Sequence, residues 1–135
     1  MRWTCPECDR EFGRTKQPHV CVPGISLDEC FAGRPDWQRA ACDALVEHVQ
    51  ALGPVHLDVV RIGVILKRDV SFGEIRPLAR SLSLAMFLPR VVDDARIARR
   101  VPVSQGRTVH FVKIVEAEVE EPVLDWLAEA YHAAT

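Results

Sequence analysis

The chain of 135 residues is long enough for one ordinary domain with a small appendage and too short for two full-sized domains. Its 48% hydrophobic and 27% charged residues are typical of a soluble globular protein and exclude a disordered chain. No apolar run approaches the roughly 20 residues of a membrane helix, so we predict no membrane span. No apolar segment of a secretory signal follows Met1, and we therefore expect a cytoplasmic protein with reduced thiols.

The formal net charge of −2 conceals an uneven distribution along the chain. Residues 61–113 carry eleven Lys and Arg against four Asp and Glu, whereas residues 114–135 carry six Asp and Glu and no Lys or Arg. One interpretation is that the basic middle and the acidic end attract each other or are simply solvated. The other is that the basic middle forms a surface for a phosphate-bearing partner such as nucleic acid.

The amino-terminal segment, residues 1–24, is predicted to be a zinc-binding module. Cys5 and Cys8 form a Cys-x2-Cys pair, which supplies two thiolates from one tight turn. His19 and Cys21 follow, and residues at i and i+2 of an extended segment point to the same side. We therefore expect a structural Zn²⁺ held by Cys5, Cys8, His19 and Cys21, with Cys30 as the alternative fourth ligand. Four protein ligands leave no open position for water, which favours a structural role.

The rest of the chain divides into a linker, residues 25–35, and an α+β domain, residues 36–135. The linker contains glycine and proline and room for one helical turn around Ser26–Phe31. Apolar residues at three- and four-residue spacing predict a first helix from Trp37 to Leu52, with Asp36 as its N-cap. The same spacing and Pro122 predict a last helix over residues 120–133. Both helices bracket the segment between them.

Between these helices the pattern changes to strands joined by short turns. β-Branched residues and apolar alternation predict strands at 55–60, 61–67, 70–75, 81–88, 100–104 and 107–115, with a short helical turn at 92–99. Strands that follow one another through short turns form an antiparallel sheet. The predicted fold is therefore α+β. A zinc knuckle is followed by a mainly antiparallel sheet, with one helix before the strands in the sequence and one after them.

The string Trp3-Thr4-Cys5-Pro6-x-Cys8-x-Arg10-x-Phe12-x-Arg14, with Gln17, His19, Cys21 and later Phe31-Ala32-Gly33, resembles a bacterial family known as domain of unknown function 5655. The likeness continues through Gly53-Pro54-Val55, Arg61-Ile62-Gly63, Val109-His110 and Trp126-Leu127. This resemblance implies an amino-terminal zinc knuckle joined to a small α+β domain, and it implies no established activity.

The sequence contains no recognised catalytic signature, such as a glycine-rich phosphate loop or a nucleophile elbow, so we lean against an enzyme. The candidate binding surface comprises Arg61, Lys67, Arg107, His56 and His110. Two functions remain open: a zinc-containing module that contacts nucleic acid, and a small-ligand or protein-interaction domain with a pocket near the two histidines. A buried, hydrogen-bonded His110 is the alternative to a histidine that contacts a ligand.

Overall fold

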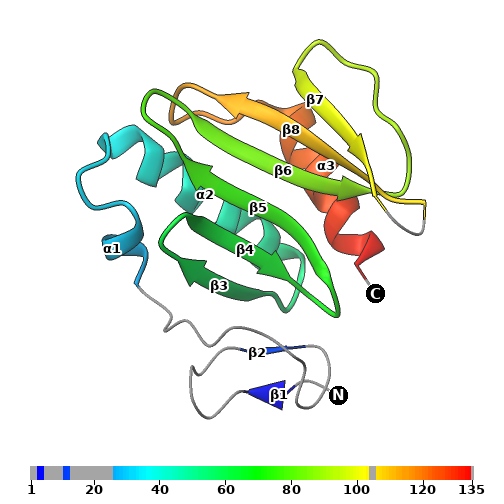
Figure 1. The fold of residues 1–135 in the computed structure, drawn as a ribbon, viewed down its shortest axis with the longest axis horizontal. Coiled ribbons are helices and arrows are strands. Elements are labelled where there is room, and N and C mark those ends of the chain that lie inside the picture. Colours follow the sequence, from blue (N-terminus) through cyan, green and yellow to red (C-terminus); the bar gives the residue numbers. More distant parts are fainter. Residues whose placement is uncertain (1–2, 5–10, 13–25, 104–105, 135) are drawn as a thin grey trace.

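In the computed structural model, residues 3–4, 11–12, 26–103 and 106–134 are described, and the four predicted zinc ligands lie outside them. Figure 1 shows the arrangement of the elements. The helices are α1 (Leu27–Cys30), α2 (Asp36–Leu52) and α3 (Glu121–Ala133). The strands are β1 (Trp3–Thr4), β2 (Glu11–Phe12), β3 (His56–Val60), β4 (Gly63–Lys67), β5 (Ser71–Pro77), β6 (Leu82–Leu88), β7 (Ile97–Pro102) and β8 (Thr108–Ile114).

Six strands form one antiparallel sheet in the order β3-β4-β5-β6-β8-β7, which confirms the predicted α+β class and antiparallel sheet. The first four strands follow one another through tight turns, as their sequence spacing predicts. β8 then pairs with β6, and β7 is displaced to the edge of the sheet. The short strands β1 and β2 pair separately, with Trp3 opposite Phe12.

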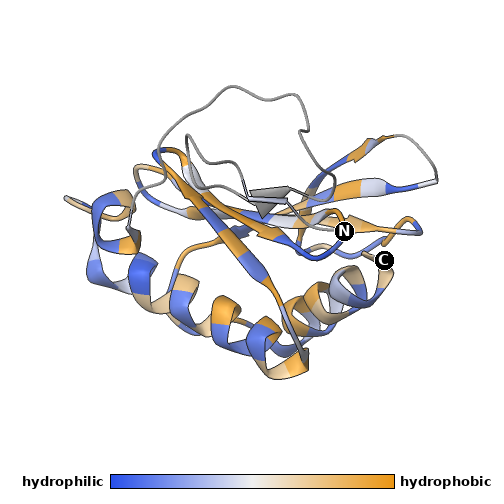
Figure 2. Cartoon of the chain, turned by 90° about the horizontal axis from the view of Figure 1, so that it is seen from below, coloured by the Kyte–Doolittle hydropathy of each residue, from blue (hydrophilic) through white to orange (hydrophobic). Residues whose placement is uncertain are grey.

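Helices α2 and α3 cover one face of the six-stranded sheet, as Figure 2 shows from below. The predicted alternation of β6 is confirmed, because Leu82, Leu84, Met86 and Leu88 are all fully buried. Their cross-strand partners Val112 and Ile114 are buried too, as are Leu45 and Leu127 of the helices. We call this side the helix face and the opposite side the outer face.

None of the described helices is long and apolar enough to cross a membrane.

The segment before α2 contributes to the core. Ser26 caps α1 in a capping box with Glu29, which satisfies backbone N–H groups at both positions. Cys30 and Phe31, at the end of this short helix, are buried in the hydrophobic core. The predicted helical turn in this segment is confirmed.

The expected N-cap of α2 is wrong by one residue. Pro35 occupies the N-cap position without a side-chain hydrogen bond, and Asp36 is the first helical residue. The fixed φ of proline, here −58°, suits the entry to the helix. Asp36 still complements the positive end of the helix dipole from within the first turn.

The predicted helical turn at 92–99 is also wrong, because the edge strand β7 begins at Ile97. Asp94 shapes the entry, since its side chain accepts a hydrogen bond from the backbone N–H of Arg96 at 2.9 Å. β7 then pairs with β8, with an irregularity between Ile97 and Arg99. An edge strand that is exposed along most of its length lacks the apolar alternation that marks a half-buried strand.

Candidate nucleic-acid interface

The outer face of β5, β6 and β8 carries a row of polar side chains. In the register of the sheet, Arg76 pairs with Ser83, and Ser83 pairs with Lys113. These residues alternate with the buried Leu82, Leu84, Val112 and Ile114, so their side chains point away from the helices. Arg76 and Lys113 are exposed. Arg76 Nε lies 3.5 Å from Oε1 of Glu74, so Lys113 is the cation of this row that no described carboxylate matches.

The next row, toward the carboxyl end of β6, is built around an aromatic ring. Ala85 pairs with Phe111, which in turn pairs with Arg99 on the edge strand. The guanidinium carbon of Arg99 lies 4.4 Å from the centroid of the Phe111 ring. The ring is half-buried and Arg99 is exposed. This is the geometry of a cation–π contact.

A second arginine and phenylalanine repeat this arrangement on the same face. The guanidinium carbon of Arg107 lies 4.5 Å from the centroid of the Phe87 ring, and its Nη2 donates a hydrogen bond to the carbonyl oxygen of Ser71 at 2.6 Å. Burial lowers the pKa of Arg107 from its ordinary value. Arginine remains protonated at neutral pH despite such a shift, so this end of the outer face also carries a positive charge.

A hollow of about 300 Å³ opens beside Phe111. Its walls combine the side chains of Leu78 and Ala98 with those of Ser83 and Lys113. Gln38 of α2 helps to hold this rim, because its buried Nε2 donates hydrogen bonds to the carbonyl oxygens of Leu78 (2.8 Å) and Ser81 (2.9 Å). The hollow is therefore part of the folded sheet and carries apolar and hydrogen-bonding groups side by side.

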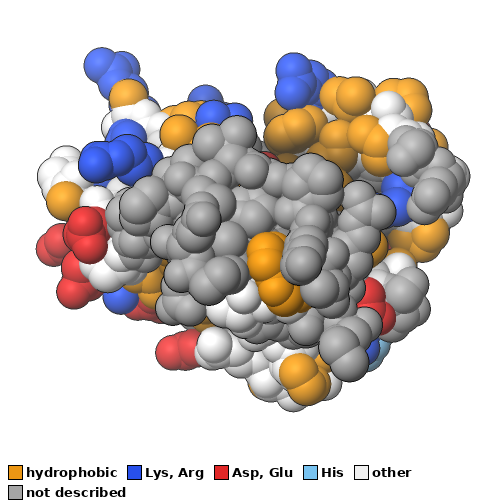
Figure 3. Space-filling model, turned by 60° about the horizontal axis from the view of Figure 1, so that its bottom comes forward, with side chains coloured by type: hydrophobic (Ala, Val, Ile, Leu, Met, Phe, Trp, Pro, Cys, Tyr) orange, Lys and Arg blue, Asp and Glu red, His pale blue; other side chains and the backbone are white. Residues whose placement is uncertain are grey.

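The outer face of β5 to β8 is basic, because Glu74 is the one acidic residue in these four strands. Figure 3 shows Lys and Arg side chains along the upper side of the molecule, the side of the outer face. The acidic helix α3 packs against the opposite face, where it contacts β5 and β6. The acidic carboxyl-terminal region neutralises other arginines: Arg90 forms a bidentate pair with Glu129, and Arg96 pairs with Glu120. Of the outer-face cations, Arg76 pairs with Glu74, whereas Arg99, Arg107 and Lys113 form no ion pair with another described residue.

The predicted surface residues do not form one site. His56 and Lys67 face each other across β3 and β4 at one end of the strands, and Arg61 lies in the exposed turn at the other end. Lys67 Nζ lies 3.2 Å from Oδ2 of the buried Asp58, so part of its charge is matched within the protein. Of the predicted residues, Arg107 is the one that belongs to the basic part of the outer face.

His110 is buried on the helix face, on the opposite side of the sheet from His56. Its Nε2 accepts a hydrogen bond from the backbone N–H of Val92 at 2.9 Å, and its Nδ1 donates to the carbonyl oxygen of Thr108 at 3.0 Å. Burial is the main cause of a lowered pKa of this imidazole. The predicted pocket shared by His56 and His110 is therefore not formed, and His110 is the buried, hydrogen-bonded histidine of the alternative interpretation.

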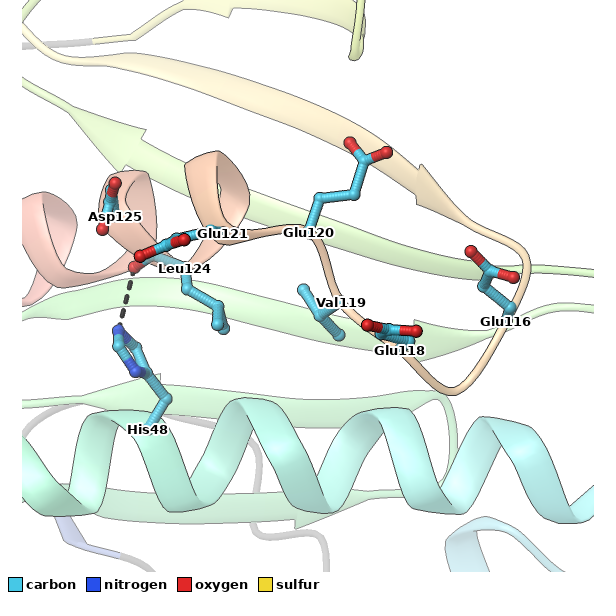
Figure 4. A pocket seen from close by; sticks show the side chains of 8 residues that line it. All are labelled: His48, Glu116, Glu118, Val119, Glu120, Glu121, Leu124 and Asp125. Carbon is cyan, nitrogen blue, oxygen red and sulfur yellow. Dashed lines mark hydrogen bonds between the residues drawn. The ribbon is translucent and has the colours of Figure 1, made fainter.

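A second hollow, of about 570 Å³, lies between α2 and the start of α3 (Figure 4). Its lining residues are His48, Glu116, Glu118, Val119, Glu120, Glu121, Leu124 and Asp125. His48 Nε2 donates a hydrogen bond to the carbonyl oxygen of Leu124 at 3.0 Å, and Glu120 is paired with Arg96. In the described part of the chain, no group of three or more His, Cys, Asp or Glu is placed to hold a metal ion.

The two described cysteines, Cys30 and Cys42, are buried free thiols. Burial raises the pKa of both, that of Cys42 to about 12, so neither thiol ionises readily at neutral pH. Cys42 thus packs as a small apolar residue in the core.

Comparison with known proteins assigns a family. A family model described as "Domain of unknown function (DUF5655)" matches residues 27–134. The chain belongs to this family. The DUF5655 match extends from α1 to the end of α3 and includes the whole six-stranded sheet, and the four predicted zinc ligands precede it. No curated protein and no solved structure matches the chain.

Sequence reasoning missed the two phenylalanines and Arg99 of this DUF5655 domain as site residues. A signal for Phe111 was present in the alternation of the last strand, where Phe111 and Lys113 share one face and Val112 and Ile114 share the other. The charge count indicated a basic middle of the chain without showing which cations gather on one face. That grouping depends on the pairing of β8 with β6 and β7, which brings distant segments together.

Proposed function

We propose that this protein is a non-catalytic, zinc-containing module that binds nucleic acid through the outer face of β5, β6, β8 and β7. The observation that carries the proposal is the pair of Arg–Phe contacts, Arg99 with Phe111 and Arg107 with Phe87, on a face that also presents Arg76 and Lys113. Phosphate groups are attracted to the cations, and guanidinium planes held over aromatic rings offer surfaces on which bases stack.

The position of α3 supports the same proposal. If the acidic helix covered the basic strands, the cations of the outer face would be neutralised within the protein. Instead α3 packs on the helix face, and its Glu129 pairs with Arg90 on that side. The acidic helix therefore does not neutralise the cations of the outer face, and its charges are matched in part by Arg90 and Arg96.

Zinc enters the proposal as a structural ion for the amino-terminal module. The donor set of Cys5, Cys8, His19 and Cys21, three thiolates and one imidazole, suits a closed tetrahedral zinc site. The described pairing of β1 with β2 places Thr4 opposite Glu11, and Cys5 and Cys8 lie between these two residues in the sequence. A bound zinc would order this segment, and the nucleic-acid surface proposed above lies on the other domain.

A binding measurement over a range of salt concentrations tests the proposal. Fluorescence anisotropy with labelled single- and double-stranded oligonucleotides of mixed sequence is expected to show binding at low salt that weakens steeply at moderate salt, because phosphate contacts release counterions. Binding should weaken in a variant that combines Arg99→Gln with Lys113→Gln and persist in Arg90→Gln, a cation on the helix face. Absence of binding to every oligonucleotide at low salt would refute the proposal.

A further inference from the structure

We propose that the nucleic acid is single-stranded and that one of its bases enters the hollow beside Phe111. This inference rests on the proposed function and deepens it, because it names the form of the ligand and the place of one base. It follows from the shape and chemistry of the hollow, which a merely basic surface would not require.

The hollow has the size and the mixed lining of a small-ligand site. Its volume of about 300 Å³ lies at the lower end of the range for such sites. Phe111, Leu78 and Ala98 supply apolar surface, which suits the flat face of a base. The Ser83 hydroxyl can donate or accept a hydrogen bond at a base edge, and the Lys113 ammonium can meet a phosphate. A flat base with polar edges, attached to a negatively charged phosphate, matches this set of groups.

Arg99 extends the same arrangement above the sheet. Its guanidinium lies over the Phe111 ring but is exposed, so the group can stack on an entering base. Guanidinium planes stack on bases as aromatic rings do. An entering base would then lie among the ring, the guanidinium and the wall formed by Ala98.

The flat faces of bases are accessible in single strands. In a duplex they are covered by their stacked neighbours, so a protein reaches mainly the base edges in the grooves and the backbone. The hollow offers apolar and aromatic surface within a sheet face. A duplex could contact the cations of this face without filling the hollow, and it should therefore bind more weakly.

The test compares a labelled oligothymidylate or oligouridylate of about 12 nucleotides, a length within the usual site sizes, with a duplex of equal length at one low salt concentration. We expect the single strands to bind at least about ten-fold more tightly than the duplex, and Phe111→Leu to weaken single-strand binding about ten-fold. Ala98→Leu, which fills the hollow from an exposed position without changing charge, should have a similar effect. Val91→Leu, an exposed substitution outside the hollow, serves as the matched control.

The results separate this inference from the proposed function. If single strand and duplex bind equally and both Phe111→Leu and Ala98→Leu retain full affinity while Arg99→Gln weakens binding, the base-stacking inference is wrong and the basic surface stands. If nothing binds, both proposals are wrong. Thermal unfolding of each variant shows whether it is folded, and Ala98→Leu keeps the test valid should Phe111→Leu lose stability. The DNA and RNA strands together show which sugar the site prefers.

Discussion

Arg99 lies over the ring of Phe111, with 4.4 Å between its guanidinium carbon and the ring centroid, although the two residues belong to different strands. The contact forms because β8 runs back antiparallel to β7 and places Phe111 directly opposite Arg99. It combines a positive charge with an aromatic surface on the side of the sheet away from the helices. Both properties are needed to bind phosphates and bases together.

Charge removal at the outer face should reduce both affinity and salt dependence. Arg99→Gln and Lys113→Gln each remove one cation, so each should lower the slope of log affinity against log salt by about one phosphate contact. Anisotropy titrations at several salt concentrations measure this slope. Arg90→Gln removes a charge that is paired with Glu129 on α3, and its slope should equal that of the unmodified protein. Equal slopes in all three variants would argue against contact at this face.

Replacement of Arg99 by lysine separates charge from stacking. Lysine retains the positive charge but lacks the planar guanidinium that lies over Phe111. We expect Arg99→Lys to keep the salt slope while it loses part of the affinity for single strands. A variant with unchanged affinity would show that charge alone accounts for the role of this residue.

His110 should contribute to stability. His110→Ala removes the acceptor for the Val92 N–H and the donor for the Thr108 carbonyl and leaves a cavity in the core, so it should lower the free energy of unfolding by about 2–4 kcal/mol. Chemical denaturation measures the difference. His132→Ala changes an exposed histidine of α3 and should have a smaller effect. Equal losses for the two variants would contradict the role assigned to the buried ring.

The same histidine should make stability depend on pH. Burial lowers the pKa of His110 in the folded state below its ordinary value of 6.5. The unfolded chain therefore takes up the proton at a higher pH than the folded chain, and stability falls as the pH drops below about 6.5. His110→Asn should flatten the dependence in this window. An unchanged pH dependence in that variant would assign it to other groups.

Zinc content tests the amino-terminal module. Protein purified without added zinc should contain about one equivalent, and Cys5→Ser or Cys8→Ser should lose it. Cys42→Ala should retain the metal, because the Cys42 thiol is buried in the core and its pKa is raised to about 12. Cys30→Ala separates the two candidate ligand sets: retention favours His19, and loss favours Cys30. Well under one equivalent in the unmodified protein would refute the zinc prediction.

The close contact of β4 with β5 at Gly63 predicts a sensitive position in the scaffold. A Cβ at this residue would collide with the backbone carbonyl oxygen of Ile75, so the strands would have to separate. Gly63→Ala should lower the free energy of unfolding by about 1–3 kcal/mol. Ile62→Ala, in the exposed turn beside it, should change stability little. Denaturation curves of the two variants that coincide would contradict this account of the hairpin.

The elements with a clear apolar period were predictable from the sequence. The alternation of Leu82, Leu84 and Met86 fixed a buried strand face, and the spacing in the two long helices indicated which sides would be buried. Ile97 to Pro102 escaped prediction because an exposed edge strand has no such period. The position of His110 depends on its pairing with Met86 on the helix face, which local pattern alone does not determine.

The most direct test of the central claim is to locate the bound nucleic acid on the protein. Two-dimensional ¹H–¹⁵N spectra of the labelled protein, recorded as oligothymidylate is added, report which backbone amides change their chemical shifts. The account predicts that the amide chemical shifts change most at Arg99, Phe111 and Lys113. Residues of the second hollow, between α2 and the start of α3, such as His48 and Asp125, should keep their shifts. Shift changes centred on the second hollow would contradict the account. So would the absence of any shift change at oligonucleotide concentrations well above that of the protein.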